Sequence, residues 1–344
     1  MCRIFVEVKV SNISHSIFFI SKNKFRSRNF MNIVYATDNN FVDVLSASIK
    51  SLYTTNSDLD LNLWIIADKV SDRNKEKINR LSKQFAQREI NWIENVEIPF
   101  KLHLDRGSIS SFSRLFLGSV LPSSMSKVLY LDSDIIVMDS LRSIFDIDFK
   151  GKILYGVNDT FNKEYKQVLG IPIDKPMFNA GVMLINLELW RNNNVEERFL
   201  QVIQKFNGTI LQGDLGVLNA VLYNSFGVLP PEYNYMTIFE DLTYEEMIVF
   251  KKPINYYSKE EIKNARERIV LRHFTTSFLS KRPWQEGSNV AHIDQFKKYY
   301  EGSYKNVKES ILLKIVQKVP KKCSVFLLGI IQSKFRPKLY RILK

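Results

Sequence analysis

Residues 127–140 read KVLYLDSDIIVMDS, an apolar run followed by two aspartates two positions apart. The run through Leu131 has the character of a buried strand, and Asp132 and Asp134 stand where it ends. In an extended turn, carboxylates at this spacing can reach one cation, and hard divalent cations prefer oxygen ligands. An ordinary solvated turn is the alternative for an isolated Asp-x-Asp pair, because aspartate favours turns.

Short apolar runs of the same kind lie on both sides of this stretch and alternate with helical patterns. The other predicted strands are residues 32–37, 61–67, 90–94, 153–157 and 181–186. Ser71 is suited to cap a charged helix that runs to about residue 87, and another helix is expected near residues 110–120. Strands separated by helices predict an α/β fold with a mostly parallel central sheet, whose ligands bind at the carboxyl ends of the strands. Residues 230–260 contain a Pro-Pro pair and weak alternation, which predict strands and loops there.

The formal net charge of +13 is concentrated at the two ends of the chain. Residues 304–344 carry eleven Lys or Arg against one Glu, a charge of +10, and residues 1–30 carry +5, which leaves −2 for the body. A nearly neutral body argues against nucleic-acid binding, which needs positive charge on the folded surface. We therefore expect an N-terminal extension (1–30), a main domain (31–303) and a basic tail (304–344). Since the regular pattern begins at Met31, the extension is expected to be dispensable for folding.

The basic tail combines lysines with apolar residues at helical spacing, as in helices that lie on a membrane surface. The apolar side begins with Ile311, Leu312, Ile315 and Val316. The longest apolar run, Cys323–Ile331, is far shorter than the roughly 20 residues that span a bilayer. Two cysteines make no disulfide framework, which favours a reducing compartment. Together these features predict a cytoplasmic protein that is peripherally attached to the inner face of the membrane through anionic lipids.

Other uses of an aspartate-rich strand end can be tested against the sequence. A calcium loop that starts at Asp132 needs Gly at its sixth position and Glu at its twelfth, where Val137 and Ser143 stand. In aspartate-nucleophile phosphotransferases a Gly or Thr usually follows the pair, and Ile135 and Ile136 weaken that interpretation. The sequence also lacks G-x-G-x-x-G and P-loop patterns, so the usual phosphate cradles of dinucleotide and NTP sites are missing.

The chain as a whole resembles glycosyltransferase family 8, the family of glycogenin and of bacterial lipopolysaccharide galactosyl- and glucosyltransferases. The resemblance covers residues 31 to about 285 and rests on six segments that occur in the family's order. They are MNIVYATDNNFVDVLSASIKSL, SISSFSRLFLGSVLP, KVLYLDSDIIVMDSL, FNAGVMLINLELWR, GDLGVLN and HFTTSFLSKRPW. This resemblance implies a nucleotide-sugar-binding fold of the GT-A type, a UDP-sugar donor, Mn²⁺ or Mg²⁺, and transfer with retained anomeric configuration. The implied acceptor is a surface glycan or glycolipid.

The resemblance also implies a metal site. Asp132 and Asp134 resemble the family's metal-binding pair, and His273 resembles a third ligand that comes from far along the chain. An imidazole in the set suits Mn²⁺ better than Mg²⁺. Taken alone, His273 would more often be a partly buried histidine without a metal. In the family a lysine before Pro-Trp contacts the diphosphate, and here Lys281 and Arg282 are both candidates for that role.

Further residues resemble the family's donor and acceptor contacts. Asp38 and Asn40 correspond to contacts with the nucleotide base, and Asp38 is also placed to cap the helix that follows it. Arg114 corresponds to a contact with the donor sugar and diphosphate, for which a planar guanidinium is suited. The remaining donor-side residues are Ser133, Asn179, Ala180 and Asp214, and the acceptor-side residue is Asp159. Of these, Arg114, Asp159 and Asp214 are the predicted catalytic residues.

The segment GDLGVLN departs from the family at Leu215, where many members have Gln. Leucine cannot act as a nucleophile, so a covalent intermediate through this position is excluded. A front-side mechanism requires only positioning and electrostatic stabilisation of the leaving UDP. The sequence therefore favours a retaining hexosyltransferase that uses UDP-glucose or UDP-galactose. A catalytically silent nucleotide-sugar-binding or membrane-scaffold protein is the alternative that Leu215 motivates.

Overall fold

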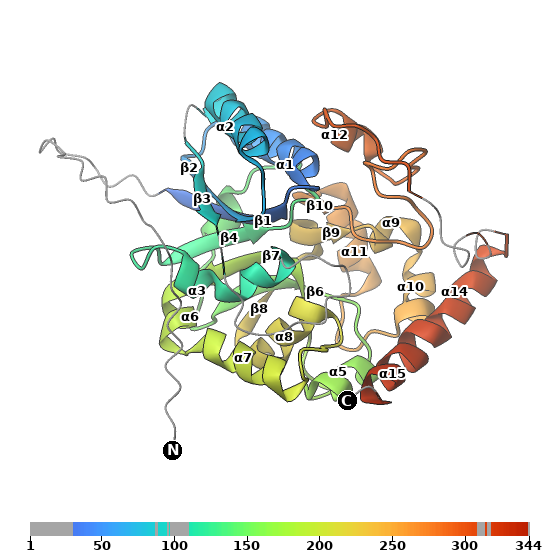
Figure 1. The fold of residues 1–344 in the computed structure, drawn as a ribbon. Helices are drawn as coiled ribbons and strands as arrows, with labels where there is room; N and C mark the ends of the chain where they lie inside the picture. The colour runs from blue at the N-terminus through green and yellow to red at the C-terminus, as the bar shows by residue number, and fades with distance from the viewer. Residues whose placement is uncertain are drawn as a thin grey trace, which may run out of the picture.

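The computed structural model of the protein describes residues 30–86, 89–94, 96, 110–307, 314 and 318–342. A seven-stranded sheet in the order β3-β2-β1-β4-β7-β6-β8 lies at its centre, with helices against both faces (Figure 1). Its strands are β1 (Met31–Asp38), β2 (Leu61–Asp68), β3 (Asn91–Glu94), β4 (Lys127–Leu131), β6 (Leu154–Asn158), β7 (Phe178–Asn186) and β8 (Phe226–Leu229). Neighbouring strands are parallel except where β7 pairs with β4 and β6. The predicted mostly parallel sheet is confirmed, with one reversed strand inside it.

Period-two burial along the strands divides the core between the two faces of this sheet. Ile33 and Tyr35 of β1 pack in the core on one face, whereas Val34 packs in the core on the other. The first core includes side chains of α1 (Val42–Thr55), α2 (Asp72–Ala86) and α4 (Arg142–Phe145). The second includes side chains of η1 (Ser110–Phe116), α3 (Leu117–Val120), α5 (Lys163–Leu169), α6 (Leu187–Asn192), α7 (Val195–Lys205) and α8 (Gly213–Leu222). As predicted, α2 begins directly after Ser71, whose Oγ accepts a 3.4 Å hydrogen bond from the N–H of Asn74.

A three-stranded sheet lies beside the large one and carries the other half of the site. It consists of β5 (Ile135–Val137), β10 (Leu271–His273) and β9 (Tyr235–Met236), with β10 in the middle. The segment Asp132–Asp134 links β4 of the large sheet to β5 of the small one. His273 pairs with Ile135 in the antiparallel β5–β10 ladder, and the N–H of Phe274 donates to the carbonyl of Asp134 at 3.0 Å. The aspartate pair therefore lies at the junction of the two sheets.

The expectation of strands and loops over residues 230–260 is wrong, because most of this region is helical. After β8 come η2 (Pro231–Asn234), the two residues of β9, α9 (Ile238–Asp241), α10 (Tyr244–Lys251) and α11 (Lys259–Glu267). Capping boxes begin two of these helices: Thr243 with Glu246 starts α10, and Ser258 with Glu261 starts α11. The pattern Ser/Thr-x-x-Glu is present in the sequence and was the signal for these helices.

The C-terminal segment forms a further helical layer against the main domain. After α12 (Ile293–Lys297), it consists of α14 (Lys321–Ile330), a π-helical segment (Ile331–Phe335) and α15 (Arg336–Ile342). Figure 1 shows α14 beside α10 and α15 beside α5. Lys321 pairs with Glu246 at 2.7 Å, and Gly329 lies so close to α10 that a Cβ would be 3.1 Å from the Cα of Phe250.

A helix at the end of the chain is therefore confirmed, although part of the predicted apolar side lies outside the described residues. The residues concerned are Ile311, Leu312, Ile315 and Val316. The N-terminal extension up to residue 29 also lies outside them. In the described portion of the chain, no helix is both long and apolar enough to cross a membrane.

Candidate active site

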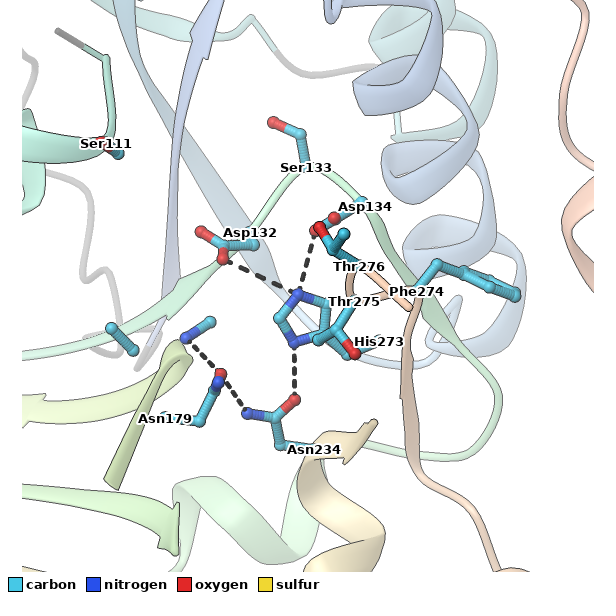
Figure 2. Close-up of polar contacts among 12 residues, drawn as sticks. Ser111, Asp132, Ser133, Asp134, Asn179, Asn234, His273, Phe274, Thr275 and Thr276 are labelled. Atoms are coloured by element: carbon cyan, nitrogen blue, oxygen red, sulfur yellow. Dashed lines mark hydrogen bonds and ion pairs between the residues drawn. The ribbon is translucent and has the colours of Figure 1, made fainter. Parts of the chain in front are cut away.

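Asp132, Asp134 and His273 come together at the junction of the two sheets (Figure 2). The Nε2 atom of His273 lies 3.1 Å from Oδ1 of Asp134 and 3.8 Å from Oδ2 of Asp132. One ligand atom from each of the three residues lies within 4.8 Å of the other two. Two carboxylates and an imidazole in this arrangement fit a divalent transition metal such as Mn²⁺. The three residues that resemble the family's ligands are thus brought to one point by the β4–β5 link and by β10.

A chain of hydrogen bonds fixes the orientation of His273. The backbone N–H of Gly181 donates to Oδ1 of Asn179 at 2.9 Å, which identifies that atom as the amide oxygen. The Nδ2 of Asn234 donates to the same oxygen at 2.9 Å, so Oδ1 of Asn234 faces Nδ1 of His273 at 2.8 Å. The imidazole must therefore donate through Nδ1, which leaves Nε2 facing the two carboxylates (Figure 2). Asn234 is therefore a functional candidate that no sequence pattern indicated.

Gly181 makes room for this imidazole. A Cβ on Gly181 would lie 2.3 Å from Cε1 and 2.7 Å from Nδ1 of His273. The carbonyl of Gly181 also accepts a hydrogen bond of 2.8 Å from the N–H of Asp132. The backbone of β7 thus binds Asp132. The same strand leaves space for the imidazole of His273 because Gly181 has no side chain.

Replacing Asn234 with alanine is expected to weaken Mn²⁺ binding by about 10–100-fold, because His273 loses the partner that orients it. Electron paramagnetic resonance of free Mn²⁺ measures the affinity directly and does not depend on turnover. The matched control is Asn193→Ala, which removes an exposed amide that donates to the carbonyl of Leu189 at 2.7 Å. Equal Mn²⁺ affinity in the two variants would show that Asn234 does not position the histidine.

Arg114 joins the aspartate pair to the other acidic residue of the site, Asp214. Its guanidinium lies 2.9 Å from Oδ1 of Asp132 and 3.1 Å from Oδ2 of Asp214, and it donates to the carbonyl of Ala180 at 2.8 Å. Tyr130 donates to Asp132 at 3.0 Å, and its ring lies 4.6 Å from the guanidinium carbon. Burial raises the pKa of Asp214, and the positive charge of Arg114 opposes that rise. The buried arginine thus holds two carboxylates in fixed orientations on the large-sheet side of the site.

Arg282, one of the two predicted diphosphate contacts, reaches the aspartate pair. Its guanidinium pairs with Oδ2 of Asp134, donates to Thr276 at 2.7 Å and lies over the ring of Trp284. Burial by itself would raise the pKa of Asp134, but His273 and Arg282 hold it well below its usual value. The carboxylate is therefore ionised throughout the neutral range.

The residues predicted to contact the nucleotide base lie where β1 ends. Oδ1 of Asp38 accepts a 2.8 Å hydrogen bond from the N–H of Asn40, and the exposed Asn40 accepts one from Lys305. The expectation that Asp38 caps the following helix is wrong, because α1 begins at Val42 with Phe41 as its N-cap. Asp38 instead stabilises the turn before the helix.

Ser133 lies between the two aspartates, whereas Asn179 and Asp159 are linked to His273 through hydrogen bonds. The Oγ of Ser133 donates to the carbonyl of Ala36 at 3.2 Å, which ties the β4–β5 link to the end of β1. Asn179 donates to Oδ2 of Asp159 at 2.8 Å, so the acceptor-side candidate is connected to the network that orients the histidine. Asn219 is fully buried and bonds both backbone groups of Phe178 at 2.8 and 2.9 Å, which gives it a structural role at the start of β7.

Comparison with solved structures establishes the class of fold. The structure of the galactosyltransferase LgtC with donor and acceptor sugar analogues superposes with a TM-score of 0.65 at 23% sequence identity. The superposition covers 81% of this chain and 98% of LgtC. The predicted GT-A-like fold is therefore confirmed.

Sequence comparison then establishes the family. Residues 32–287 match the family model described as Glycosyl transferase family 8, so the chain belongs to that family. Glycosyltransferase GlyB of Streptococcus pneumoniae is 28% identical over 263 residues, which are 76% of this chain but only 59% of GlyB. The lipopolysaccharide 1,2-glucosyltransferase of Escherichia coli K12 is 25% identical over 278 residues, 79% of this chain and 78% of the relative.

Proposed function

We propose that this protein is a retaining hexosyltransferase that moves glucose or galactose from a UDP-sugar to a surface glycan or glycolipid. The observation that carries the proposal is the convergence of Asp132, Asp134 and His273 on one point, with Arg114 and Asp214 beside it. The printed activities of two relatives, a 1,2-glucosyltransferase and a 1,3-galactosyltransferase of lipopolysaccharide, support a hexose donor.

The protein's side chains have separate tasks in the proposed reaction. Asp132, Asp134 and His273 hold the divalent cation, which when bound neutralises charge on the leaving diphosphate. Arg114 keeps Asp132 and Asp214 in place, and Asp214 binds the hydroxyls of the donor sugar. The acceptor hydroxyl attacks from the side of the departing UDP, whose phosphate oxygen takes the proton. The side chain of Leu215 has no chemical task in this route, because the route needs only positioning and electrostatic stabilisation.

The test is a screen of UDP-sugars for slow metal-dependent hydrolysis by the full chain, with UDP release as the readout. Release from UDP-glucose or UDP-galactose with Mn²⁺, and its loss with EDTA, is the expected result. The configuration of the released sugar, followed by NMR before mutarotation, tests retention. Failure of every UDP-hexose to react would favour the catalytically silent alternative.

Two adjacent substitutions on α8 separate donor binding from nucleophilic catalysis. Asp214→Asn is expected to lower turnover severely, since it removes the charge that pairs with Arg114 at 3.1 Å. Leu215→Ala is expected to lower turnover by less than tenfold, roughly what loosened packing of one side chain produces. Steady-state UDP release measures the turnover of both variants. Mass spectrometry then searches for a peptide that carries a covalently linked sugar. A covalently trapped sugar on any side chain would contradict the front-side route.

We also propose that the C-terminal helices attach the protein to anionic membranes. Five large apolar side chains on these helices are about half exposed or more: Phe326, Leu327, Ile331, Phe335 and Leu339. Exposed lysines stand among them at positions 322, 334 and 338. Each cation near an anionic leaflet contributes about 1 kcal/mol, and inserted apolar side chains add to this attraction.

Ile331→Glu is expected to reduce co-sedimentation with phosphatidylglycerol-containing vesicles at low salt, because a carboxylate would have to enter the lipid interface. The matched control is Ile173→Glu, since Ile173 lies outside the tail and is 45% exposed, compared with 48% for Ile331. Circular dichroism checks that both variants fold. Equal vesicle binding by the two variants, or none by the parent chain, would contradict attachment through the tail.

A further inference from the structure

Lys305, the first cation of the predicted basic tail, packs on the main domain. Its N–H donates to the carbonyl of Trp284 at 2.9 Å, and its own carbonyl accepts from the N–H of Glu286 at 3.1 Å, so that it forms a parallel bridge with Gln285. The next residue, Asn306, donates to the carboxylate of Glu286 at 2.9 Å. The backbone at the start of the tail is therefore fixed beside the loop that follows β10.

The side chain of Lys305 reaches the turn that follows β1. Its Nζ donates to the carbonyl of Asn40 at 2.9 Å and lies 5.9 Å from the centre of the Phe41 ring. Trp284 packs edge-on against the same ring, with 5.7 Å between the two ring centres. A hydrogen bond, a cation–π contact and an aromatic contact thus join the start of the tail to this turn.

The turn is held by a second set of contacts from the main domain. Oδ1 of Asn39 accepts from the N–H of Ser71 at 2.9 Å and from Nδ2 of Asn74 at 2.8 Å. Within the turn, Asp38 accepts from the N–H of Asn40 at 2.8 Å. Asn39 and Asn40 are exposed, so burial does little to fix the turn. Its position therefore depends on these individual contacts, of which the one from Lys305 acts directly on Asn40.

The same part of the chain borders the predicted diphosphate contact. Oε1 of Gln285 accepts from the N–H of Arg282 at 3.0 Å, and the guanidinium of Arg282 lies 5.1 Å from the ring centre of Trp284. Arg282 in turn pairs with Asp134. Because Lys305 is bridged to Gln285, it connects the turn expected at the nucleotide base with the loop expected at the diphosphate.

We infer that Lys305 is a positioning residue for the nucleotide base of the donor. It fixes the carbonyl of Asn40 and thereby the orientation of Asp38 and Asn40, which are the expected base contacts. This inference rests on the proposed function, since a UDP-sugar is what brings a uracil base to this turn. It also gives the first lysine of the tail a part in donor binding that is separate from membrane attachment.

Ligand-observed NMR titrations of the full chain in EDTA test the inference without metal or turnover. The probes are UMP, uridine and ribose 5-phosphate, so that the contribution of the base is separated from that of the phosphate. Lys305→Met is expected to weaken the binding of UMP and of uridine equally, by about 3–10-fold, as the loss of one hydrogen bond predicts. Binding of ribose 5-phosphate should not change.

Two further variants serve as controls. Lys305→Arg keeps a cationic donor for the Asn40 carbonyl and should recover most of the affinity for uridine. Lys298→Met removes another exposed cation over a ring, since its Nζ lies 5.2 Å from the ring centre of Tyr299, and should leave binding of all three probes unchanged.

Hydrogen–deuterium exchange of the free protein shows whether Lys305 acts through the turn. Lys305→Met should speed exchange in a peptide that covers residues 38–41, whereas Lys298→Met should not. Equal uridine affinity for Lys305→Met and the parent chain, or unchanged exchange in this peptide, would overturn the inference. Weaker binding of UMP and ribose 5-phosphate with unchanged uridine would also overturn it, because Lys305 would then contact phosphate directly.

Thermal melting and UDP binding separate the remaining outcomes. Lys305 is exposed, so the melting temperature of Lys305→Met should match that of the parent chain. A lower melting temperature with weaker binding of all three probes would indicate a purely structural role and overturn the inference. Absence of UDP binding by the parent chain overturns the proposed function, whereas UDP binding that is independent of Lys305 overturns only the positioning role.

Discussion

Replacing Asp134 with asparagine is expected to lower metal-dependent UDP-sugar turnover by roughly 10³-fold or more, because the cation that stabilises the leaving UDP loses a charged ligand. Asparagine keeps the size of the side chain, so the β4–β5 link is preserved. The same variant should lose tight Mn²⁺ binding, which electron paramagnetic resonance measures without substrate. Asp132→Asn is expected to lower turnover and Mn²⁺ binding in the same way, because Oδ2 of Asp132 lies 3.8 Å from Nε2 of His273.

The control for these substitutions is Asp146→Asn, an exposed residue at the end of α4. It changes the net charge by the same amount and should leave turnover and Mn²⁺ binding unchanged. Near-native turnover of Asp134→Asn in Mn²⁺ would refute the metal assignment.

Replacing Arg114 with methionine is expected to have the largest effect on stability, a loss of about 3–5 kcal/mol in the free energy of unfolding. The substitution leaves Asp132 and Asp214 buried without the cation between them and removes the donor to the Ala180 carbonyl. Turnover should also fall, since both carboxylates lose their orientation. Arg114→Lys keeps the charge but not the planar fork, so it should recover part of the stability and little of the activity.

Urea unfolding and UDP release measure these two effects separately. Arg142→Met is the control, because Arg142 forms an exposed pair with Asp58 at 2.9 Å and should contribute little to stability. If Arg114→Met unfolded at the same urea concentration as the parent chain, Arg114 would not be the cation that compensates the two buried carboxylates.

The sequence was sufficient to predict six of the seven strands of the large sheet and the aspartate pair, since these depend on local patterns, whereas β8 and the short strands β5 and β10 were not predicted. Buried strands of four to eight residues with polar residues at their ends are visible without knowledge of the fold. The reversed direction of β7 was not visible, because an apolar run such as FNAGVMLIN has the same character in either direction. The helices α10 and α11 were missed although their capping boxes were present.

The parts of the site that escaped prediction depend on long-range contacts. Asn234 ends a short 3-10 helix, and nothing in the local sequence PEYN indicates a partner for a histidine 39 residues later. The pairing of Arg282 with Asp134 depends on the path of the loop after β10. Resemblance to the family identified His273, whereas the hydrogen bonds that orient it required the folded structure.

The position of the aspartate pair between two sheets makes the site sensitive to distant changes. Asp132 is fixed by β7 of the large sheet, and His273 is carried by the small sheet, whose outer strands are β5 and β9. A substitution in the core under α9, α10 or α11 can shift the small sheet as a rigid body and move the imidazole relative to the carboxylate without touching either. Redesign of donor or metal preference therefore has to preserve the relative placement of both sheets, and random variation far from the site should be screened for lost catalysis as well as for lost stability.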